Sequence, residues 1–483
     1  MKRHVRTAFL LTFLLPFFLA AETLHVYSTT DLHGHVISTG GRPGLPQLAE
    51  TLRRETAALG KENTLLIDCG DLIQGTFETQ LDKGSLVLQL MNHAGYDVWV
   101  PGNHDFELGM RTLLDRTRDF RGTVLCGNLR IRGKAPMAAW KLFHKAGLNV
   151  AVIGITSEYI TAWNWRPSDQ GIAILKTMRV LATVMPEVMK AKPDLILLAV
   201  HAGRFQSSRF RPEWQMRDIA VRYPQIDLIL GGHTHTVVKG LPLAGKVWYL
   251  QAGKHATGYS KAEIVYDKQK KKRISLTSVY RELPSGGAAP EPADPVLKRK
   301  LADIRKNMRS VVCRNAPALG IRDPGHLARV FCEAVADQTG APIVFHGVLS
   351  RADKKAGTYT RKDVYDLCPF ENTAVLMDLS PSECRAILRE QQKAWNTKKG
   401  NAMPQAVLGV TLEDDGTLRL SNGRVWNNEQ ERLTTAFNSF IASSAGMRFP
   451  ELKRIAAKQE VNGRDTGLKI RLLLETYLRR NFQ

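Results

Sequence analysis

Cysteine is scarce in this sequence and never occurs in close pairs. The chain has six cysteines in 483 residues, and none shows the C-x-x-C spacing typical of structural zinc sites. A cysteine-rich metal site is therefore not expected. If the chain reaches an oxidising compartment, we expect at most one disulfide, among the four cysteines of the C-terminal half.

Long hydrophobic runs are also missing, except at the N-terminus. Three basic residues precede an apolar run from Thr7 to Ala20, and small residues stand at Ala20 and Ala21. This pattern is typical of a secretory signal peptide, here residues 1–21. The run is shorter than the roughly 20 residues that a spanning helix needs. We expect a protein secreted across the inner membrane, periplasmic or extracellular, without a membrane span; the alternative is an uncleaved N-terminal anchor.

Acidic residues are too few to balance the basic ones. The 46 Asp and Glu face 68 Lys and Arg, which leaves a formal net charge of +22. Such a chain concentrates anions near its surface; the alternative is a basic surface with no dedicated acidic partner. The run KQKKKR, Lys268–Arg273, lies between two alternating apolar stretches and predicts the exposed tip of a hairpin. We expect no specific nucleic-acid partner.

The chain length exceeds what one hydrophobic core usually serves, so two domains are expected. Up to about Tyr280, apolar runs rich in β-branched residues end in glycine-containing turns and alternate with helical stretches, such as 45–58 and 176–190, which predicts an α/β fold. A Pro- and Gly-rich linker and a helical stretch follow. We expect domains at 22–283 and 311–483, joined by a linker and linker helix at 284–310, with Asp465 and Thr466 starting the last helix.

The ends of the predicted strands carry a set of oxygen and imidazole donors. Ligands in α/β sheets gather at the carboxyl ends of strands. A lone His after a strand is usually a hydrogen-bonded surface or core residue, but in GGHTHT two imidazoles two residues apart point the same way. The seven candidate ligands are Asp31, His33, Asp71, Asn103, His201, His233 and His235.

Seven donors are too many for one ion and enough for two if one carboxylate is shared. Oxygen and imidazole ligands suit Zn²⁺, Mn²⁺ or Fe²⁺. The order of the motifs along the chain, D-x-H, G-D, G-N-H, H and G-H-x-H, is unlike a set of unrelated turn residues. The sequence therefore predicts a site for two divalent metal ions, Zn, Mn or Fe.

That ordered set resembles the calcineurin-like metallophosphoesterases. With its second half, the chain resembles the exported two-domain 5'-nucleotidase family: LCPFENT, 367–373, is similar to the family's P-F-x-N segment, and DTGLKIR is similar to the start of its last helix. The resemblance implies a four-layer αββα sandwich followed by a smaller α/β domain that recognises the substrate. The linker and its helix resemble the family's hinge, which implies closure of the second domain over the metals.

The resemblance also implies how the ligands are divided. Asp31, His33 and His235 would hold one metal, Asn103, His201 and His233 the other, and Asp71 would bridge the two. Two neighbouring cations lower the pKa of a shared water, so that hydroxide exists near neutral pH, and they neutralise charge on the phosphoryl oxygens. The phosphoester would then be cleaved by metal-bound hydroxide, without a protein nucleophile.

His104 follows a candidate ligand directly and is expected beside the metals without binding them. There it would donate a hydrogen bond or a proton to the phosphoryl oxygen or the leaving group. The family places the partner carboxylate of this His three residues later, which here is Glu107 where the family usually has Asp. Asp105 is expected to be structural and to bond backbone amides of the turn.

The substrate-recognition loops depart from the family pattern. The family's Asn-x-Gly-Gly-Ile-Arg loop is HGVLSR here, and only Arg351 is retained as a bidentate phosphate contact. The later Gly-Gly-Asp-Gly-aromatic loop is SSAGMRF here, without the acidic residue and one glycine. Phe440 before this loop and Phe449 at its end are candidates to stack on a base or to pack in the core. Phosphoryl chemistry is expected to be retained, while specificity for a nucleoside stays open.

These observations predict an exported phosphoester hydrolase, similar to 5'-nucleotidases, that acts as a monomer on small-molecule phosphoesters such as nucleotides, UDP-sugars or 2',3'-cyclic nucleotides. One alternative is a hydrolase of the same fold that releases sulfur-bound sulfate. The other is a non-catalytic protein that binds phosphorylated ligands, and the complete set of metal ligands disfavours it.

Overall fold

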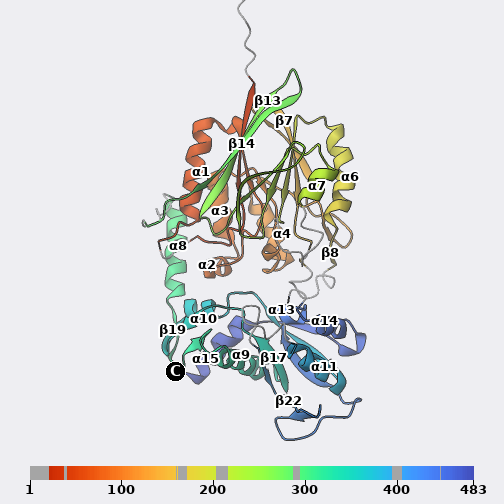
Figure 1. Cartoon of the computed structure of the whole chain (residues 1–483). Coiled ribbons are helices and arrows are strands. Elements are labelled where there is room, and N and C mark those ends of the chain that lie inside the picture. The colour runs from red at the N-terminus through yellow and green to blue at the C-terminus, as the bar shows by residue number, and fades with distance from the viewer. Residues whose placement is uncertain are drawn as a thin grey trace, which may run out of the picture.

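Figure 1 shows a computed structural model of the chain, with a mixed α/β N-terminal domain above a smaller α/β C-terminal domain. The structure describes residues 21–36, 41–158, 160, 171–202, 216–286, 294–393, 405–445 and 448–483. The predicted signal peptide falls almost entirely outside the described residues. Within the described residues, no helix has the length and apolar character to cross a membrane.

Two six-stranded sheets form the centre of the N-terminal domain. The first has the order β14 (Lys272–Glu282), β13 (Gly258–Asp267), β1 (Glu22–Thr29), β2 (Thr64–Asp68), β3 (Val98–Trp99), β4 (Thr123–Val124). The second has the order β11 (Val237–Ala244), β12 (Val247–Ala252), β10 (Leu228–Gly231), β9 (Leu195–Val200), β7 (Leu148–Ile155), β6 (Trp140–Lys145). In each sheet the central strands run parallel, so their carboxyl ends lie at one edge.

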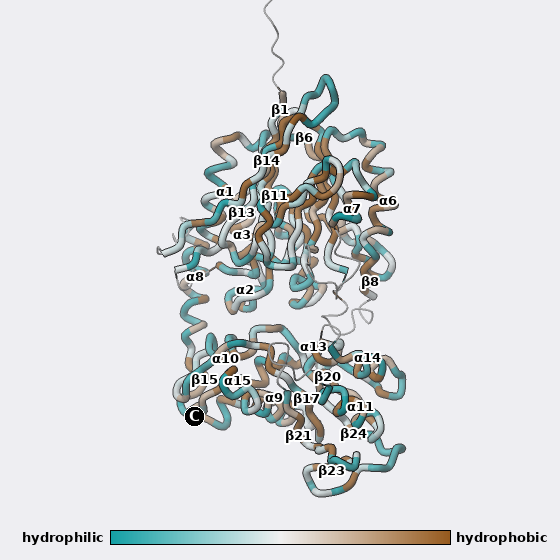
Figure 2. Tube along the Cα trace, in the orientation of Figure 1, coloured by the Kyte–Doolittle hydropathy of each residue, from teal (hydrophilic) through white to brown (hydrophobic). Residues whose placement is uncertain are grey.

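Successive side chains of a strand point to opposite faces of the sheet, and the two faces pack in different hydrophobic cores. Val26 of β1 packs between the two sheets with Leu197 and Leu228 of the second sheet. Tyr27, the next residue, packs on the opposite face against helices α1 (Leu45–Leu59) and α3 (Ser85–Ala94). The outer face of the second sheet packs against α6 (Thr177–Lys190) and α7 (Met216–Arg222). The predicted four-layer αββα arrangement is confirmed, and Figure 2 shows apolar residues concentrated along its strands.

Shorter elements connect these layers. They are η1 (Lys61–Asn63), α2 (Phe77–Leu81), η2 (His104–Phe106), α4 (Met110–Asp119), β5 (Leu129–Ile131) and β8 (Ile172–Ile174). The predicted helices at 45–58 and 176–190 are confirmed as α1 and α6. The basic run at 268–273 lies at the turn of the β13–β14 hairpin, as predicted.

The C-terminal domain contains a five-stranded sheet covered on both faces. Its order is β21 (Gln405–Leu408), β17 (Ile343–Gly347), β24 (Leu433–Asn438), β20 (Thr373–Leu379), β25 (Arg464–Lys469). Helices α9 (Pro324–Thr339) and α15 (Ile470–Asn481) pack on one face, and α11 (Pro381–Gln391) and α14 (Pro450–Ala456) on the other. The remaining elements are β15 (Val311–Ala316), β16 (Leu319–Gly320), β18 (Asp353–Lys354), β19 (Gly357–Thr360), β22 (Val410–Leu412), β23 (Leu418–Leu420), α13 (Ser439–Ala442) and η4 (Gln459–Val461).

The predicted start of the last helix is wrong. Asp465 and Thr466 belong to β25, and α15 begins at Ile470. Asp465 is opposite Val375 of β20 and accepts a hydrogen bond from Thr373 through its carboxylate, 2.9 Å. The side chain that resembles a helix cap therefore bonds across a sheet instead.

The disulfide considered for the C-terminal half is not formed, which is within the expectation of at most one. All six cysteines are free and buried. Cys332 and Cys384 lie in the two cores on opposite faces of the C-terminal sheet. The cysteines therefore serve as small apolar core residues.

Helix α8 (Pro295–Met308) connects the domains, as the sequence predicts for this stretch. Its Leu297, Leu301 and Ile304 pack in the core of the N-terminal domain that contains α1 and α3. Arg361, at the start of α10 (Arg361–Leu367) in the C-terminal domain, donates to the side chain of Asn307 at 3.0 Å. The linker helix thus packs in the core of the N-terminal domain and makes a polar contact with the C-terminal domain.

A tyrosine of the C-terminal domain reaches the strand-end loops of the N-terminal domain. The hydroxyl of Tyr365 donates to the carbonyl oxygen of Gly75 at 2.7 Å, and its ring meets Phe77 edge-on at 5.8 Å. Phe370, from the PF segment, lies nearly parallel to the His104 ring at 6.4 Å. The C-terminal domain therefore covers the edge at which the candidate ligands gather.

Candidate metal centre and active site

The structure brings all seven candidate ligands together at one edge of the two sheets. Asp31 and His33 follow β1, Asp71 follows β2, and Asn103 follows β3. His201 follows β9, and His233 and His235 follow β10 of the second sheet. The two sheets face each other, so their parallel strands deliver these side chains to one place.

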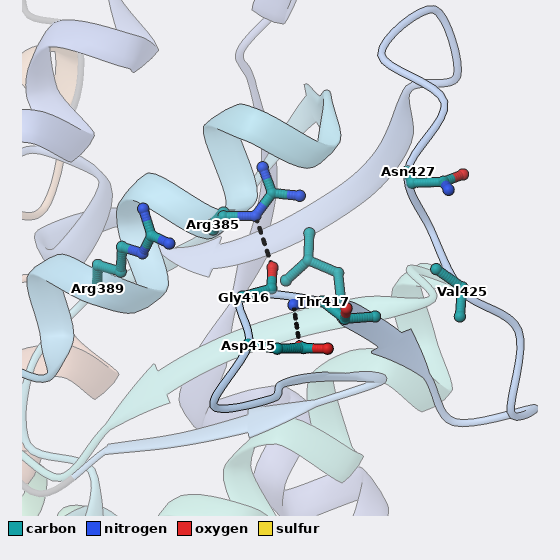
Figure 3. Close-up of a pocket in the computed structure, with 8 residues that line it drawn as sticks. Arg385, Arg389, Asp415, Gly416, Thr417, Val425 and Asn427 are labelled. Atoms are coloured by element: carbon teal, nitrogen blue, oxygen red, sulfur yellow. Dashed lines mark hydrogen bonds between the residues drawn. The ribbon is translucent and has the colours of Figure 1, made fainter.

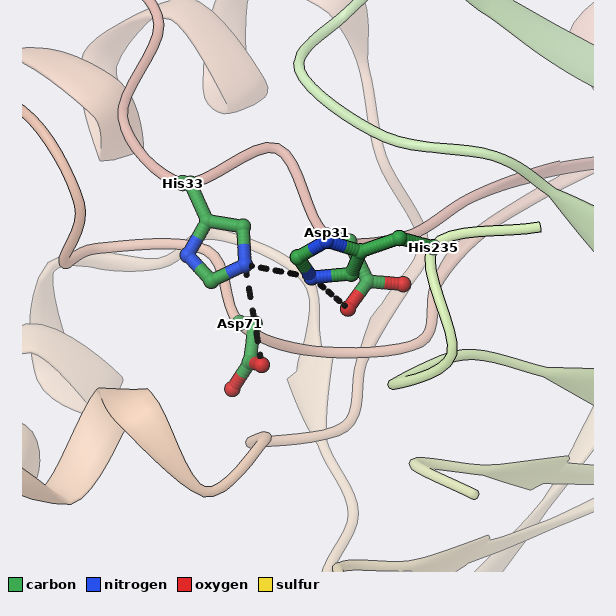
Figure 4. Close-up of side chains that lie close together, drawn as sticks. All are labelled: Asp31, His33, Asp71 and His235. Carbon is green, nitrogen blue, oxygen red and sulfur yellow. Dashed lines mark hydrogen bonds and ion pairs between the residues drawn. The ribbon is translucent and has the colours of Figure 1, made fainter. Parts of the chain in front are cut away.

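The first group of converging donors contains Asp31, His33, Asp71 and His235 (Figure 4). One ligand atom from each lies within 4.8 Å of all the others. The Nε2 atoms of His33 and His235 are 3.0 Å apart, and Nε2 of His235 is 3.4 Å from Oδ1 of Asp31. Nδ1 of His33 faces the carbonyl oxygen of Gln74 at 3.1 Å, which directs Nε2 into the group.

The second group shares Asp71 with the first. Asp71, His201 and His233 again offer ligand atoms within 4.8 Å of one another. The side-chain oxygen of Asn103 lies 2.7 Å from Nδ1 of His233 and so joins this group. Two ligand groups with one carboxylate in common could hold two neighbouring divalent cations.

Two buried atoms in the centre face each other as an ion pair and make no hydrogen bond of regular geometry among the described residues. They are Oδ2 of Asp71 and Nε2 of His201, which lie 3.0 Å apart. Nδ1 of His201 faces the carbonyl oxygen of Cys69 at 2.7 Å, so Nε2 points into the site. Buried polar atoms without partners are costly. A divalent cation would satisfy both, and carboxylate, imidazole and amide donors fit such an ion.

The electrostatics of the centre depend on Asp71. Burial by itself raises the pKa of Asp71, but His201 and His104 hold it well below its usual range. Burial lowers the pKa of His201, and Asp71 raises it to about 9. Without a metal, therefore, the cluster compensates the Asp71 carboxylate with protonated imidazoles, and a bound cation would take over that compensation.

Five of the seven candidate ligands have left-handed backbone conformations. The φ angles are 52° for Asp31, 46° for His33, 56° for Asp71, 71° for His233 and 57° for His235. Such angles are uncommon for residues other than glycine and cost free energy. The surrounding fold holds this strain at the point where the donor atoms converge.

Gly102 allows the loop after β3 to approach Asp71 closely. A Cβ atom on Gly102 would lie 2.2 Å from Oδ1 and 2.3 Å from the backbone nitrogen of Asp71. We expect Gly102→Ala to lower the free energy of unfolding by about 1–3 kcal/mol, because the site has no room for a methyl group. Chemical denaturation measures this change. Gly325→Ala is the control, since its Cβ would meet nothing closer than 3.8 Å; equal stability of the two variants would contradict the expectation.

His104 lies beside the shared carboxylate and outside both ligand groups. Its backbone nitrogen donates to Oδ1 of Asp71 at 2.7 Å, and its Nδ1 lies 2.5 Å from Oε1 of Glu107. Burial by itself lowers the pKa of His104, but Glu107 and then Asp71 raise it to about 10. His104 therefore donates through Nδ1 to Glu107 and presents Nε2 as a second donor.

Asp105 does not pair with His104 but holds three backbone amides. Oδ1 accepts from the backbone nitrogens of Leu72 and Ile73, both at 2.8 Å, and Oδ2 accepts from that of Gly102 at 2.8 Å. Its side chain is fully buried. Asp105 thus ties the loop after β2 to the loop after β3, as the sequence suggested for the turn.

We expect Asp105→Asn to destabilise the fold by about 2 kcal/mol. The Asn amide group would face the backbone N–H of Gly102 and leave two donors without an acceptor, and a hydrogen bond to a charged group contributes about 1.5–3 kcal/mol. Thermal and denaturant unfolding measure the loss. The control is Asp115→Asn, at an exposed carboxylate of α4 that pairs with Arg118. Unchanged stability of Asp105→Asn would rule out this role.

The sequence analysis missed two further histidines next to the first ligand group. His35 and His255 stack at 4.0 Å between ring centroids, and His255 lies 5.7 Å from His33 and 5.8 Å from His235. The sequence could have indicated His255, because this residue follows β12, which is a parallel neighbour of β10. The same strand-end argument that selects His233 would have selected it.

The three residues predicted to bind the substrate are not all accessible at the surface. Arg351 is exposed in the loop after β17, and no described contact joins it to the ligand groups. Phe440 is partly buried at the start of α13. Phe449 is 1% exposed and packs in the core with Trp426. This placement favours a packing role for Phe449 and leaves Arg351 and Phe440 as the accessible pair.

A cavity of about 430 Å³ lies elsewhere, in the C-terminal domain between α11 and the β22–β23 hairpin (Figure 3). Arg385 donates to the carbonyl oxygen of Gly416 there at 2.9 Å. The side chain of Arg389 also borders the cavity. None of the residues that line it belongs to the candidate site.

Both halves of the chain match known families. Residues 24–237 match the calcineurin-like phosphoesterase family, and residues 310–447 match the 5'-nucleotidase C-terminal domain. UshA from Escherichia coli is 24% identical over 79% of this chain and 80% of its own length. A solved structure described as a candidate 5'-nucleotidase from Staphylococcus aureus superposes with a TM-score of 0.76 at 18% identity, over 95% of this chain and 97% of its own.

A third relative shows that the shared fold does not decide the substrate. The sulfate thiohydrolase SoxB from Thermus thermophilus superposes with a TM-score of 0.61 at 19% identity, over 95% of this chain and 94% of its own. At these identities the solved structures show the fold alone. The two family matches and the converging donors show that the chain belongs to the calcineurin-like phosphoesterases with a 5'-nucleotidase C-terminal domain and is a metal-dependent phosphoester hydrolase.

Proposed function

We propose that this protein is an exported 5'-nucleotidase-like hydrolase that uses two divalent ions, Zn, Mn or Fe, to remove phosphate from nucleotides or related phosphoesters. The observation that carries the proposal is the shared Asp71, which belongs to both groups of converging donors. UDP-sugars and 2',3'-cyclic nucleotides are further candidate substrates. We also propose that it acts as a monomer, with a signal peptide at 1–21, domains at 22–283 and 311–483, and the linker at 284–310.

In this proposal one ion would be held by Asp31, His33 and His235. The other would be held by Asn103, His201 and His233, and Asp71 would contribute to both groups. When bound, the two ions supply an activated water and neutralise charge on the phosphoryl group. The side chains that are not ligands then orient the substrate and manage its protons.

His104 and Glu107 are proposed to act together on the reacting group. The contact of 2.5 Å between them holds the imidazole so that Nε2 can donate a hydrogen bond or a proton to the phosphoryl oxygen or the leaving group. Phe370 faces the same ring, with 6.4 Å between the ring centroids. Since Phe370 comes from the C-terminal domain, this neighbour of His104 depends on the position of that domain.

Substrate binding is proposed to fall to Arg351 and Phe440 of the C-terminal domain. A guanidinium group can bind a phosphate through two parallel hydrogen bonds, and the face of a partly buried aromatic ring such as that of Phe440 can stack on a base. Closure of the C-terminal domain would bring Arg351 to the metals. Phe449 is buried among apolar side chains of the C-terminal domain, so we propose no substrate contact for it.

Turnover and metal content of the purified protein test the proposal. Each of Zn²⁺, Mn²⁺ and Fe²⁺ is loaded separately, and AMP, ATP, a UDP-sugar, 2',3'-cyclic AMP, bis-p-nitrophenyl phosphate and an S-sulfonated peptide are offered as substrates. We expect two ions per chain and release of phosphate from a nucleotide. Release of sulfate alone would support the sulfur-bound-sulfate alternative. Absence of both stoichiometric metal and turnover would support a binding protein.

A further inference from the structure

A tyrosine of the C-terminal domain contacts the loop that orients a candidate metal ligand. The hydroxyl of Tyr365 donates to the carbonyl oxygen of Gly75 at 2.7 Å. The carbonyl oxygen of the preceding residue, Gln74, faces Nδ1 of His33 at 3.1 Å. Two consecutive carbonyl groups of one loop, residues 74–76, are therefore engaged by the C-terminal domain and by a ligand of the first group. We call residues 74–76 the ligand loop.

The ligand loop packs directly on His33. A Cβ atom on Gly75 would lie 2.5 Å from Cβ and 2.7 Å from the carbonyl oxygen of His33, so the two backbones are in close contact. The hydroxyl of Thr76 donates to the carbonyl oxygen of Gly34, the residue after His33, at 2.8 Å. A shift of the ligand loop is therefore transmitted to the His33 ring, whose Nε2 points into the first ligand group.

Two sequence motifs of the C-terminal domain hold the Tyr365 ring. The guanidinium group of Arg471, in DTGLKIR, lies 4.9 Å from the ring centroid and donates to the carbonyl oxygen of Cys368 at 3.1 Å. The carboxylate of Glu371, in LCPFENT, forms an ion pair with Arg471, and both side chains are buried. Because removing one partner of a buried ion pair is costly, the position of Arg471 against the ring is strongly fixed.

The opposite side of the Tyr365 ring meets the N-terminal domain. Phe77, the first residue of α2, packs edge-on against it at 5.8 Å between ring centroids. Tyr365 and Phe77 are both buried. Burial raises the pKa of the Tyr365 hydroxyl, which therefore stays protonated and remains a donor throughout the neutral pH range.

These contacts form a continuous path between the domains. It runs from the buried ion pair through Tyr365 to the ligand loop and ends at His33. Groups that orient a metal-binding imidazole through its other ring nitrogen contribute about 10–100-fold to metal affinity. Tyr365 acts one peptide unit further from the ion than the carbonyl group of Gln74 does. We therefore expect its contribution near the lower end of that range.

We propose that Tyr365 is a positioning residue for the first ligand group, so that the affinity of this group for its metal ion depends on the docking of the C-terminal domain. This role rests on the proposed function, in which His33 is a metal ligand. It gives the C-terminal domain a task besides substrate recognition. Since coupling between two binding equilibria is reciprocal, the bound ion in turn stabilises the docked domain.

Calorimetric titration of the chelator-treated full chain with Mn²⁺ tests the proposal. Tyr365→Phe keeps the ring and loses only the hydroxyl, and we expect one of the two ions to bind about tenfold more weakly while the other is unaffected. Tyr359→Phe is the matched control, because this buried hydroxyl donates to the carbonyl oxygen of Pro317 at 2.8 Å within the C-terminal domain. The control should bind both ions as the unsubstituted chain does, even if its stability falls. Unchanged affinity for both ions in Tyr365→Phe overturns the proposal.

A double-mutant cycle tests whether the effect passes through His33. His33→Asn removes the ligand and tolerates the left-handed backbone, and adding Tyr365→Phe should leave the affinity of the remaining ion unchanged. In His233→Asn, which disables the other ligand group, the added Tyr365→Phe should still weaken binding about tenfold. Equal effects of Tyr365→Phe in the two backgrounds overturn the proposal.

Turnover decides on the proposed function separately. A chain that shows the expected metal affinities but hydrolyses none of the offered phosphoesters refutes the proposed function and supports the role of Tyr365. A chain that hydrolyses a nucleotide and has the same metal affinities in Tyr365→Phe supports the proposed function and refutes that role. If the unsubstituted chain binds no Mn²⁺, the role of Tyr365 is refuted as well.

Discussion

Asp71→Asn is expected to lower kcat/KM toward a nucleotide by about 10⁴-fold or more. Each of two cations contributes several kcal/mol of charge stabilisation in phosphoryl transfer, and 1.36 kcal/mol corresponds to a factor of ten in rate. Asp71 is the one residue present in both ligand groups. An amide oxygen carries no negative charge, so Asn at this position would bind two cations more weakly than the carboxylate does.

The loss at Asp71 should be visible in metal content as well as in rate. Atomic emission of the purified variant should report fewer than two ions per chain, whereas the fold, measured by circular dichroism, should be kept. Asp119→Asn is the control, because that carboxylate is half exposed on the last residue of α4 and pairs with Arg116. A variant that retained two ions and a tenth of the activity would show that Asp71 is not the shared ligand.

The positions of the donor atoms were predictable because they depend on a simple rule of α/β sheets. Parallel strands end at one edge, so Asp31 and Asp71, although far apart in the sequence, had to approach each other once β1 and β2 paired. This rule does not explain how the seven candidate ligands divide into two groups. The division depends on how the two sheets face each other, and the sequence indicated it only through the resemblance to a family.

Other features could not be predicted because they depend on contacts that a strand pattern does not encode. Asp465 has the side chain of a helix cap, yet pairing with β20 places it in a strand. Phe449 lies in a loop motif that elsewhere can bind a base, yet the core of the C-terminal domain encloses it. Tyr365 donates to Gly75 across 290 positions of the chain, a contact that only the packing of the two domains produces. Local propensity is overridden by tertiary packing in each of these cases.

His104→Ala is expected to lower kcat by about 10³-fold while both metal ions stay bound. General acid–base catalysis contributes about 10²–10⁴-fold, and His104 belongs to neither ligand group. Steady-state kinetics with AMP and with bis-p-nitrophenyl phosphate measure the effect. The loss should be smaller with the nitrophenyl ester, because its leaving group needs less protonation. A variant with full activity toward both substrates would remove His104 from the mechanism.

Glu107→Gln separates the two carboxylates of this turn. Glu107 contacts Nδ1 of His104, whereas Asp105 is fully committed to backbone amides. We expect Glu107→Gln to lower kcat about tenfold with little change in stability, because the imidazole loses its charged partner but keeps a hydrogen bond. Asp105→Asn should instead lower stability and leave the kcat of the folded fraction within a few fold. The opposite result, a catalytic defect in Asp105→Asn with Glu107→Gln fully active, would mean that His104 depends on Asp105 once substrate is bound.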